Sequence, residues 1–97
     1  MTRLEFRPQA EKEIDDAAAW YEEQASGLGV DFLKAVDAAL DVIVRTPYAF
    51  SKIARGTRRY PMRRFPYGII YQPAADVILI VSCFHDHRDP AHWRNRL

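Results

Sequence analysis

The chain contains a single cysteine, Cys83, among its 97 residues. One cysteine excludes a disulfide within the chain and a cysteine-based zinc site, and it is typical of a reducing compartment. No apolar run reaches the roughly 18 residues that a membrane span requires. The opening segment MTRLEFRPQAEKEIDD lacks the apolar core of a signal peptide and carries acids early. We therefore expect a cytoplasmic protein that does not enter the membrane.

Lysine is also scarce, because Lys52 is the only lysine after Lys34. Residues 55–97 hold eight Arg and three Asp, whereas residues 1–54 hold six Lys or Arg and ten Asp or Glu. The basic half suggests an acidic or polyanionic partner. Two amphipathic helices with acidic outer faces would give the same division, so the charge pattern leaves both interpretations open.

The spacing of apolar residues predicts one α+β domain over residues 1–97. Short links predict an antiparallel hairpin of two long helices and a mainly antiparallel meander of the last three strands. Pro61 marks the first strand of that meander as an edge strand or a bulged strand. The predicted elements are a strand at 3–7, helices at 8–25 and 30–46, a loop at 47–56, strands at 57–65, 67–72 and 76–84, and a short helix from Pro90.

The apolar stripes of the two helices must pack on one face of this sheet. The segment 76–84 is a continuous apolar run, which indicates a strand that is covered on both faces or central in its sheet. The predicted core consists of Ile14, Tyr21, Phe32, Val36, Leu40, Ile43, Ile69, Ile70, Ile78 and Ile80.

A polar segment, FHDHRDPAHWRNRL at 84–97, follows the last apolar strand. His85 and His87 could face one side of the strand end, but no cysteine lies at ligand spacing, so we expect neither a metal site nor a cofactor. Asp89 and Pro90 suit the start of a helix. Trp93 should anchor that helix by packing.

The densest basic run consists of Arg58, Arg59, Arg63 and Arg64. Such charges can protect a solvated edge strand from aggregation. They can also bind an acidic segment of a partner protein or the phosphates of a nucleic acid. We favour the acidic protein segment, because a basic edge strand can accept an added strand or a docked helix.

The order of the elements, the segment RRFPYGIIY at 63–71 and the ending HDHRDPAHWRNRL resemble the RelE/ParE superfamily of bacterial toxins over essentially the whole chain. The resemblance implies the toxic half of a type II toxin–antitoxin module, also called a plasmid stabilisation protein. It implies a hetero-oligomer with a small antitoxin whose C-terminal segment wraps the toxin. RelE-like members cut messenger RNA in the ribosomal A site, whereas ParE-like members are non-enzymatic poisons of DNA gyrase.

A RelE-like cut needs a base for the ribose 2′-hydroxyl, cations at the phosphorus and a donor for the leaving oxygen. The residues available for that chemistry are His85, His87, Arg88 and Arg64. The ribosome-dependent nucleases typically place an arginine just before the apolar-apolar-Tyr of the middle strand. Gly68 stands there in this chain, and no other strand residue obviously replaces the missing cation.

This departure favours a ParE-like toxin without a catalytic centre, for which we expect gyrase as the target. The antitoxin or the target would then bind to Arg58, Arg59, Arg63, Arg64, Arg88, Trp93, Arg94 and Arg96. The alternative is a RelE-like nuclease of ribosome-bound messenger RNA. A third hypothesis is an interaction module that has no toxicity.

Overall fold

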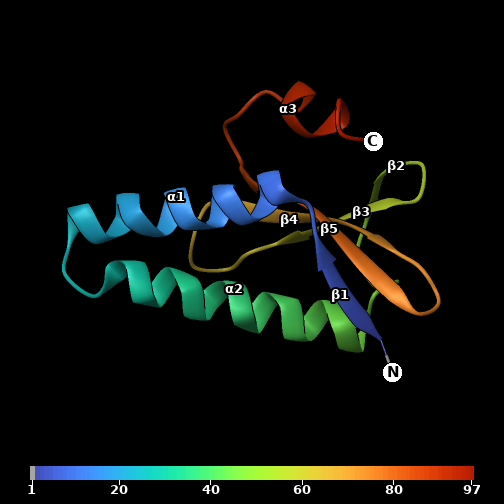
Figure 1. The fold of residues 1–97 in the computed structure, drawn as a ribbon, viewed down its shortest axis with the longest axis horizontal. Coiled ribbons are helices and arrows are strands. Elements are labelled where there is room, and N and C mark those ends of the chain that lie inside the picture. The colour runs from blue at the N-terminus through green and yellow to red at the C-terminus, as the bar shows by residue number, and fades with distance from the viewer. Residues whose placement is uncertain (1) are drawn as a thin grey trace.

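A helix hairpin and a twisted five-stranded sheet form the two layers of the structure, a computed structural model that describes residues 2–97 (Figure 1). The sheet order is β1-β5-β4-β3-β2, in which β1 runs parallel to β5 and the other neighbours are antiparallel. The elements are β1 (Arg3–Phe6), α1 (Pro8–Gln24), α2 (Leu28–Arg45), β2 (Lys52–Ala54), β3 (Thr57–Pro61), β4 (Tyr67–Pro73), β5 (Val77–His85) and α3 (Ala91–Arg94). The predicted α+β class is confirmed.

The link between α1 and α2 depends on two glycines and one acid. Gly27 has φ +87, a conformation that side chains rarely adopt, and it turns the chain into α2. A Cβ at Gly29 would lie 2.6 Å from the carbonyl oxygen of Ala18, so the absence of a side chain lets the two helices approach closely. The Glu22 carboxylate accepts hydrogen bonds from the backbone N–H groups of Gly27 and Gly29, each at 3.0 Å. These contacts satisfy donors that a helix start leaves free.

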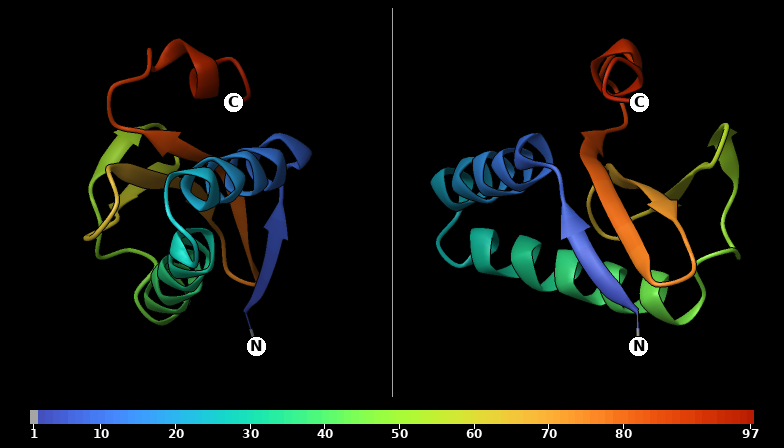
Figure 2. Two further views of the ribbon diagram at one scale, coloured as in Figure 1. Left: turned by 90° about the vertical axis from the view of Figure 1, so that its left-hand side faces the viewer. Right: turned by 45° about the vertical axis from the view of Figure 1, so that its right-hand side comes forward.

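The main core lies between the hairpin and the sheet. All the predicted core residues are buried except Tyr21 and Leu40, which are partly buried and pack against the core. Ile70 lies on the opposite face of the sheet, which we call the outer face, where it packs with Val81, Phe84 and Trp93. The views in Figure 2 show the hairpin on one side of the sheet and α3 beyond the end of β5. The strand β5 is therefore covered on both faces, as its apolar run predicts.

A β-bulge interrupts the pairing of β4 with β5. Ile70 pairs with Ser82 and the next residue of β4, Tyr71, pairs with Ile80, so Val81 is the extra residue. The bulge shifts the alternation of side chains by one position. As a result Ile80 and Cys83 both face the hairpin, although they are three residues apart.

The predicted loop at 47–56 is wrong in its second half, because residues 52–54 form β2. Gly56, at φ +67, allows the tight turn through which β2 pairs with the start of β3. The strand β3 is therefore not the outermost strand, and it ends at Pro61 rather than continuing to residue 65. A three-residue strand has too few positions to show an alternating pattern.

The C-terminal helix begins at Ala91, one residue later than predicted, and it has the predicted anchor. Asp89 Oδ1 accepts the backbone N–H of Ala91 at 3.0 Å, and α3 then covers a single turn. Trp93 is 4% exposed and packs on the outer-face cluster. Within residues 2–97, no helix is both long and apolar enough to span a membrane.

We predict that Ile43→Ala lowers the free energy of unfolding by about 3 kcal/mol, because it leaves a cavity where a fully buried side chain packs in the main core. Val30→Ala on the same helix is the control, since Val30 is 54% exposed, and it should change the free energy by less than about 0.5 kcal/mol. Urea unfolding measures both. Equal effects of the two substitutions would contradict this position of the core.

Candidate functional site

A cleft of about 670 Å³ opens between α1 and the ends of β4 and β5. Three of the residues proposed for a nuclease centre, His85, His87 and Arg88, line it together. Arg64 lies elsewhere, paired with Asp31 of α2 at 3.2 Å. The remaining lining residues come from α1, β5, the start of β4 and the residue before it: Glu13, Asp16, Ala17, Trp20, Tyr21, Pro66, Tyr67 and Cys83.

The residues of α1 that line the cleft were not among the predicted site residues, although the sequence contains a signal for them. Positions 13, 16, 17 and 20 follow the i, i+3, i+4, i+7 spacing, which places them on one face of a helix. Trp20 at the end of that face is 55% exposed. Trp20 therefore leaves aromatic surface open at the edge of the cleft.

The two histidines lie where β5 ends. The ring of His85 lies 5.0 Å from the ring of Tyr67 and 5.4 Å from the ring of His87, measured between centroids. The backbone N–H of His87 donates to Nδ1 of His85 at 3.1 Å, so Nδ1 is the acceptor and Nε2 carries the ring proton. His87 lines the cleft because the turn after β5 brings it there, and not because it follows His85 along a continuing strand.

The floor of the cleft holds groups that stay protonated at neutral pH. Burial raises the pKa of Tyr21 and of Tyr67, and the Arg88 guanidinium opposes part of the rise at Tyr67. Burial, with a smaller contribution from Glu13, raises the pKa of the Cys83 thiol to about 12. The two phenols therefore act as hydrogen-bond donors, and the thiol is not a nucleophile.

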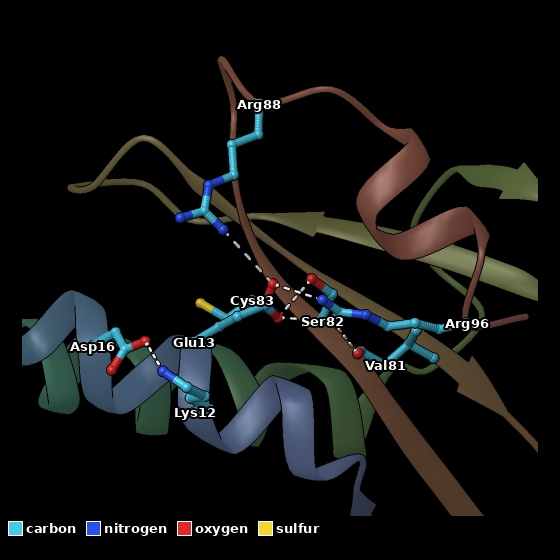
Figure 3. Close-up of polar contacts among 8 residues, drawn as sticks. All are labelled: Lys12, Glu13, Asp16, Val81, Ser82, Cys83, Arg88 and Arg96. Carbon is cyan, nitrogen blue, oxygen red and sulfur yellow. Dashed lines mark hydrogen bonds and ion pairs between the residues drawn. The ribbon is translucent and has the colours of Figure 1, made fainter.

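A carboxylate–guanidinium pair closes the inner end of the cleft (Figure 3). Arg96 binds both oxygens of Glu13, at 2.9 and 3.1 Å, and the two side chains are only 17% and 12% exposed. Glu13 Oε1 also accepts the Ser82 hydroxyl at 2.9 Å and the backbone N–H of Cys83 at 3.3 Å. Arg96 donates in addition to the carbonyl oxygen of Val81 at 3.1 Å. The pair thus provides hydrogen-bond partners for the backbone of Val81 and Cys83 at the β-bulge. The pairing of β1 with β5 ends at Ile80, so β1 does not reach these groups.

Arg88 is held much more loosely than Arg96. Its guanidinium lies 3.9 Å from Glu13 Oε2, and its side chain is 55% exposed. Figure 3 shows it descending from the turn after β5 toward Glu13. Arg88 is therefore the cation of the cleft that can turn toward a ligand.

On the outer face of the sheet, Arg59 occupies the space beside Gly68. A Cβ at Gly68 would lie 2.7 Å from Cζ of Arg59, and the Arg59 guanidinium is paired with Asp86 in the turn after β5. The position beside Gly68 therefore holds a guanidinium that is already paired with a carboxylate. A neighbouring strand supplies it, because Pro61 pairs with Gly68 and the Arg59 side chain extends along that face.

The predicted basic run does not form one surface. Arg58 donates to the carbonyl oxygens of Tyr48 and Phe50, at 3.1 and 2.7 Å, and so fixes the loop before β2. Arg63 lines a separate groove between α2 and β3.

The two C-terminal arginines, Arg94 and Arg96, also lie apart from each other. Arg94 lies over the ring of Trp93, with Cζ 5.3 Å from the centroid, whereas Arg96 points inward to Glu13. Among residues 2–97, no three His, Cys, Asp or Glu side chains are grouped so that they could hold a metal ion.

We predict that Glu13→Gln destabilises the fold by about 3 kcal/mol, because it leaves the largely buried Arg96 without a counter-charge. Asp41→Asn is the matched control. It removes an exposed carboxylate from its ion pair with Arg45, which should cost less than about 0.5 kcal/mol. If thermal or urea unfolding gave both variants the same stability, the pair would not have the structural role assigned to it.

Gly68→Ala should keep the fold and displace Arg59, since the new methyl group collides with the movable end of that side chain. The loss of the partly exposed pair with Asp86 should cost less than about 1 kcal/mol. Residues 85–88 should become more mobile in backbone NMR relaxation, and Asp86→Asn should reproduce the change. An unaltered turn in both variants would show that Arg59 does not position it.

Comparisons with known proteins agree with this fold. The family described as "ParE toxin of type II toxin-antitoxin system, parDE" matches residues 4–90. No curated protein sequence matches the chain. A solved structure entitled "Chromosomal ParDE TA system from P. aeruginosa" is similar at a TM-score of 0.63 and 16% identity, covering 88% of this chain and 96% of the other. The family match spans most of the sequence, and the chain therefore belongs to the ParE toxin family of type II toxin–antitoxin systems.

Proposed function

We propose that the protein inhibits growth by binding DNA gyrase, without cleaving RNA, and that a cognate antitoxin neutralises it in a hetero-oligomeric complex. The family match over residues 4–90 supports a toxin. The choice of gyrase over the ribosome rests on how the histidines and cations are distributed.

Cleavage at a phosphate needs acid–base groups and free cations that face the same point. His85 and His87 share their cleft with one exposed cation, Arg88, and with two carboxylates, those of Glu13 and Asp16. Arg59 lies on the opposite face of the sheet and is paired with Asp86. Asp86 holds Arg59, and among residues 2–97 only Arg88 stands with the histidines against the two carboxylates. This shortage of free positive charge at the histidines is the observation that carries the proposal.

The antitoxin could also bind to an apolar surface that lies outside the cleft. An apolar groove of about 560 Å³ between α2 and β3 has Arg63 in its lining. Among residues 2–97, β2 is the outermost strand on this side of the sheet and pairs only with the start of β3. An acidic amphipathic segment would fit this groove, with its apolar side chains inside and a carboxylate at Arg63.

The test adds purified protein to gyrase during plasmid supercoiling and, separately, to translation on programmed ribosomes. We expect inhibition of supercoiling with intact messages, and growth arrest when the protein is expressed without its antitoxin. Codon-dependent message cleavage that His87→Ala abolishes would establish the RelE-like alternative, which the grouping of His85, His87 and Arg88 would then explain. Normal growth together with unaffected gyrase would leave the non-toxic interaction module.

A further inference from the structure

We propose that the cleft between α1 and β5 binds an acidic peptide segment, with a carboxylate on Arg88 and the neighbouring apolar side chain against Trp20. The owner of that segment is identified as the antitoxin only through the proposed function. The binding chemistry itself follows from the lining of the cleft.

The first step concerns charge. The oxygens of Glu13 already accept two hydrogen bonds from Arg96, one from Ser82 and one from the backbone of Cys83. The guanidinium of Arg88 lies 3.9 Å from this carboxylate, whose oxygens already have these four donors. A guanidinium has five N–H donors, so Arg88 can remain near Glu13 and bind a second carboxylate with the others.

The second step concerns neutral donors. Tyr21 and Tyr67 line the cleft, with ring centroids 6.3 Å apart, and burial keeps both phenols protonated. Every fully buried side-chain N or O atom among residues 2–97 has a hydrogen-bond partner. Phenol hydroxyls beside a guanidinium form a donor-rich lining, which is suited to an oxyanion.

The third step concerns the apolar part of the ligand. Trp20 is 55% exposed and stands with Ala17 and Pro66 along the cleft. Trp20 and Tyr21 form a T-shaped pair, at 5.1 Å between centroids and an interplanar angle of 83°, and the exposed part of Trp20 remains free to contact a ligand. An aromatic or aliphatic side chain next to the carboxylate would cover that surface.

A peptide fits the cleft better than a nucleic acid does. A nucleic acid strand carries a phosphate roughly every 3.4 Å of helix axis in duplex form, so its neighbouring phosphates would meet the acids of α1. Asp16 lies in the cleft lining, and Glu23 is exposed near the end of the same helix. A single carboxylate can reach Arg88 without placing further charge against that wall.

The test titrates the purified protein with N-acetyl-Phe-Asp-amide and follows the indole N–H of Trp20 and the amides of residues 85–88 by NMR. We expect saturable shifts with a dissociation constant on the order of millimolar, as suits a small fragment. N-acetyl-Phe-Asn-amide should bind about tenfold more weakly, the loss expected for one charge-assisted hydrogen bond. Arg88→Gln should lower the affinity for the Asp peptide to the same degree.

Arg45→Gln is the matched control, because Arg45 is an exposed arginine of α2 that is paired with Asp41 outside the cleft; it should leave the affinity unchanged. Equal binding of the Asp and Asn peptides, or an absence of shifts in residues 85–88, overturns the proposal. Uridine 5′-monophosphate that binds more tightly than the Asp peptide would assign the cleft to a nucleotide instead. None of these readouts depends on toxicity, so failure of the gyrase assay and failure of this proposal are distinguishable.

Discussion

The ion pair between Glu13 and Arg96 is the interaction on which the rest of the structure depends. It joins residues that are 83 positions apart and connects α1, the bulged part of β5 and the C-terminal turn. The parallel pairing of β1 with β5 stops at Ile80, and Pro8 begins α1 immediately afterwards. The two side chains then supply hydrogen bonds to the backbone of Val81 and Cys83 that a longer β1 would have supplied.

This arrangement determines how the cleft is charged. Because Arg96 neutralises Glu13 from the inside, Arg88 on the open side comes no closer than 3.9 Å to Glu13 and remains exposed. The β-bulge directs Cys83 and His85 toward α1, while Arg59 and Gly68 lie on the outer face. One residue of extra length in β5 thus places the Cys83 and His85 side chains on the cleft face of the sheet, opposite the face on which Arg59 lies.

Much of the fold could be predicted from the sequence, because the periods of the helices and the apolar run of β5 are strong local signals. Pro8, Gly27 and Asp89 likewise mark element boundaries by their own chemistry. The site could be predicted only in part. The cluster of His85, His87 and Arg88 is local in the chain, whereas Glu13 is recognised only once α1 lies against β5. The basic run did not indicate how its arginines pair, because the partners are set by the folded chain. Asp31 lies 33 residues from Arg64 and Asp86 lies 27 residues from Arg59, while the two loop carbonyls lie 10 and 8 residues from Arg58.

Native-state hydrogen exchange of Arg96→Gln tests the importance of the Glu13–Arg96 pair most directly, because it resolves local opening from global unfolding. The amide of Cys83, which donates to Glu13, and the amides of α3 should lose protection by the largest factors. The α2 amides around Ile43 should follow only the smaller global change. Equal loss of protection throughout the chain, or unchanged protection at Cys83 and α3, would contradict the claim that this pair holds β5 and the C-terminal segment together.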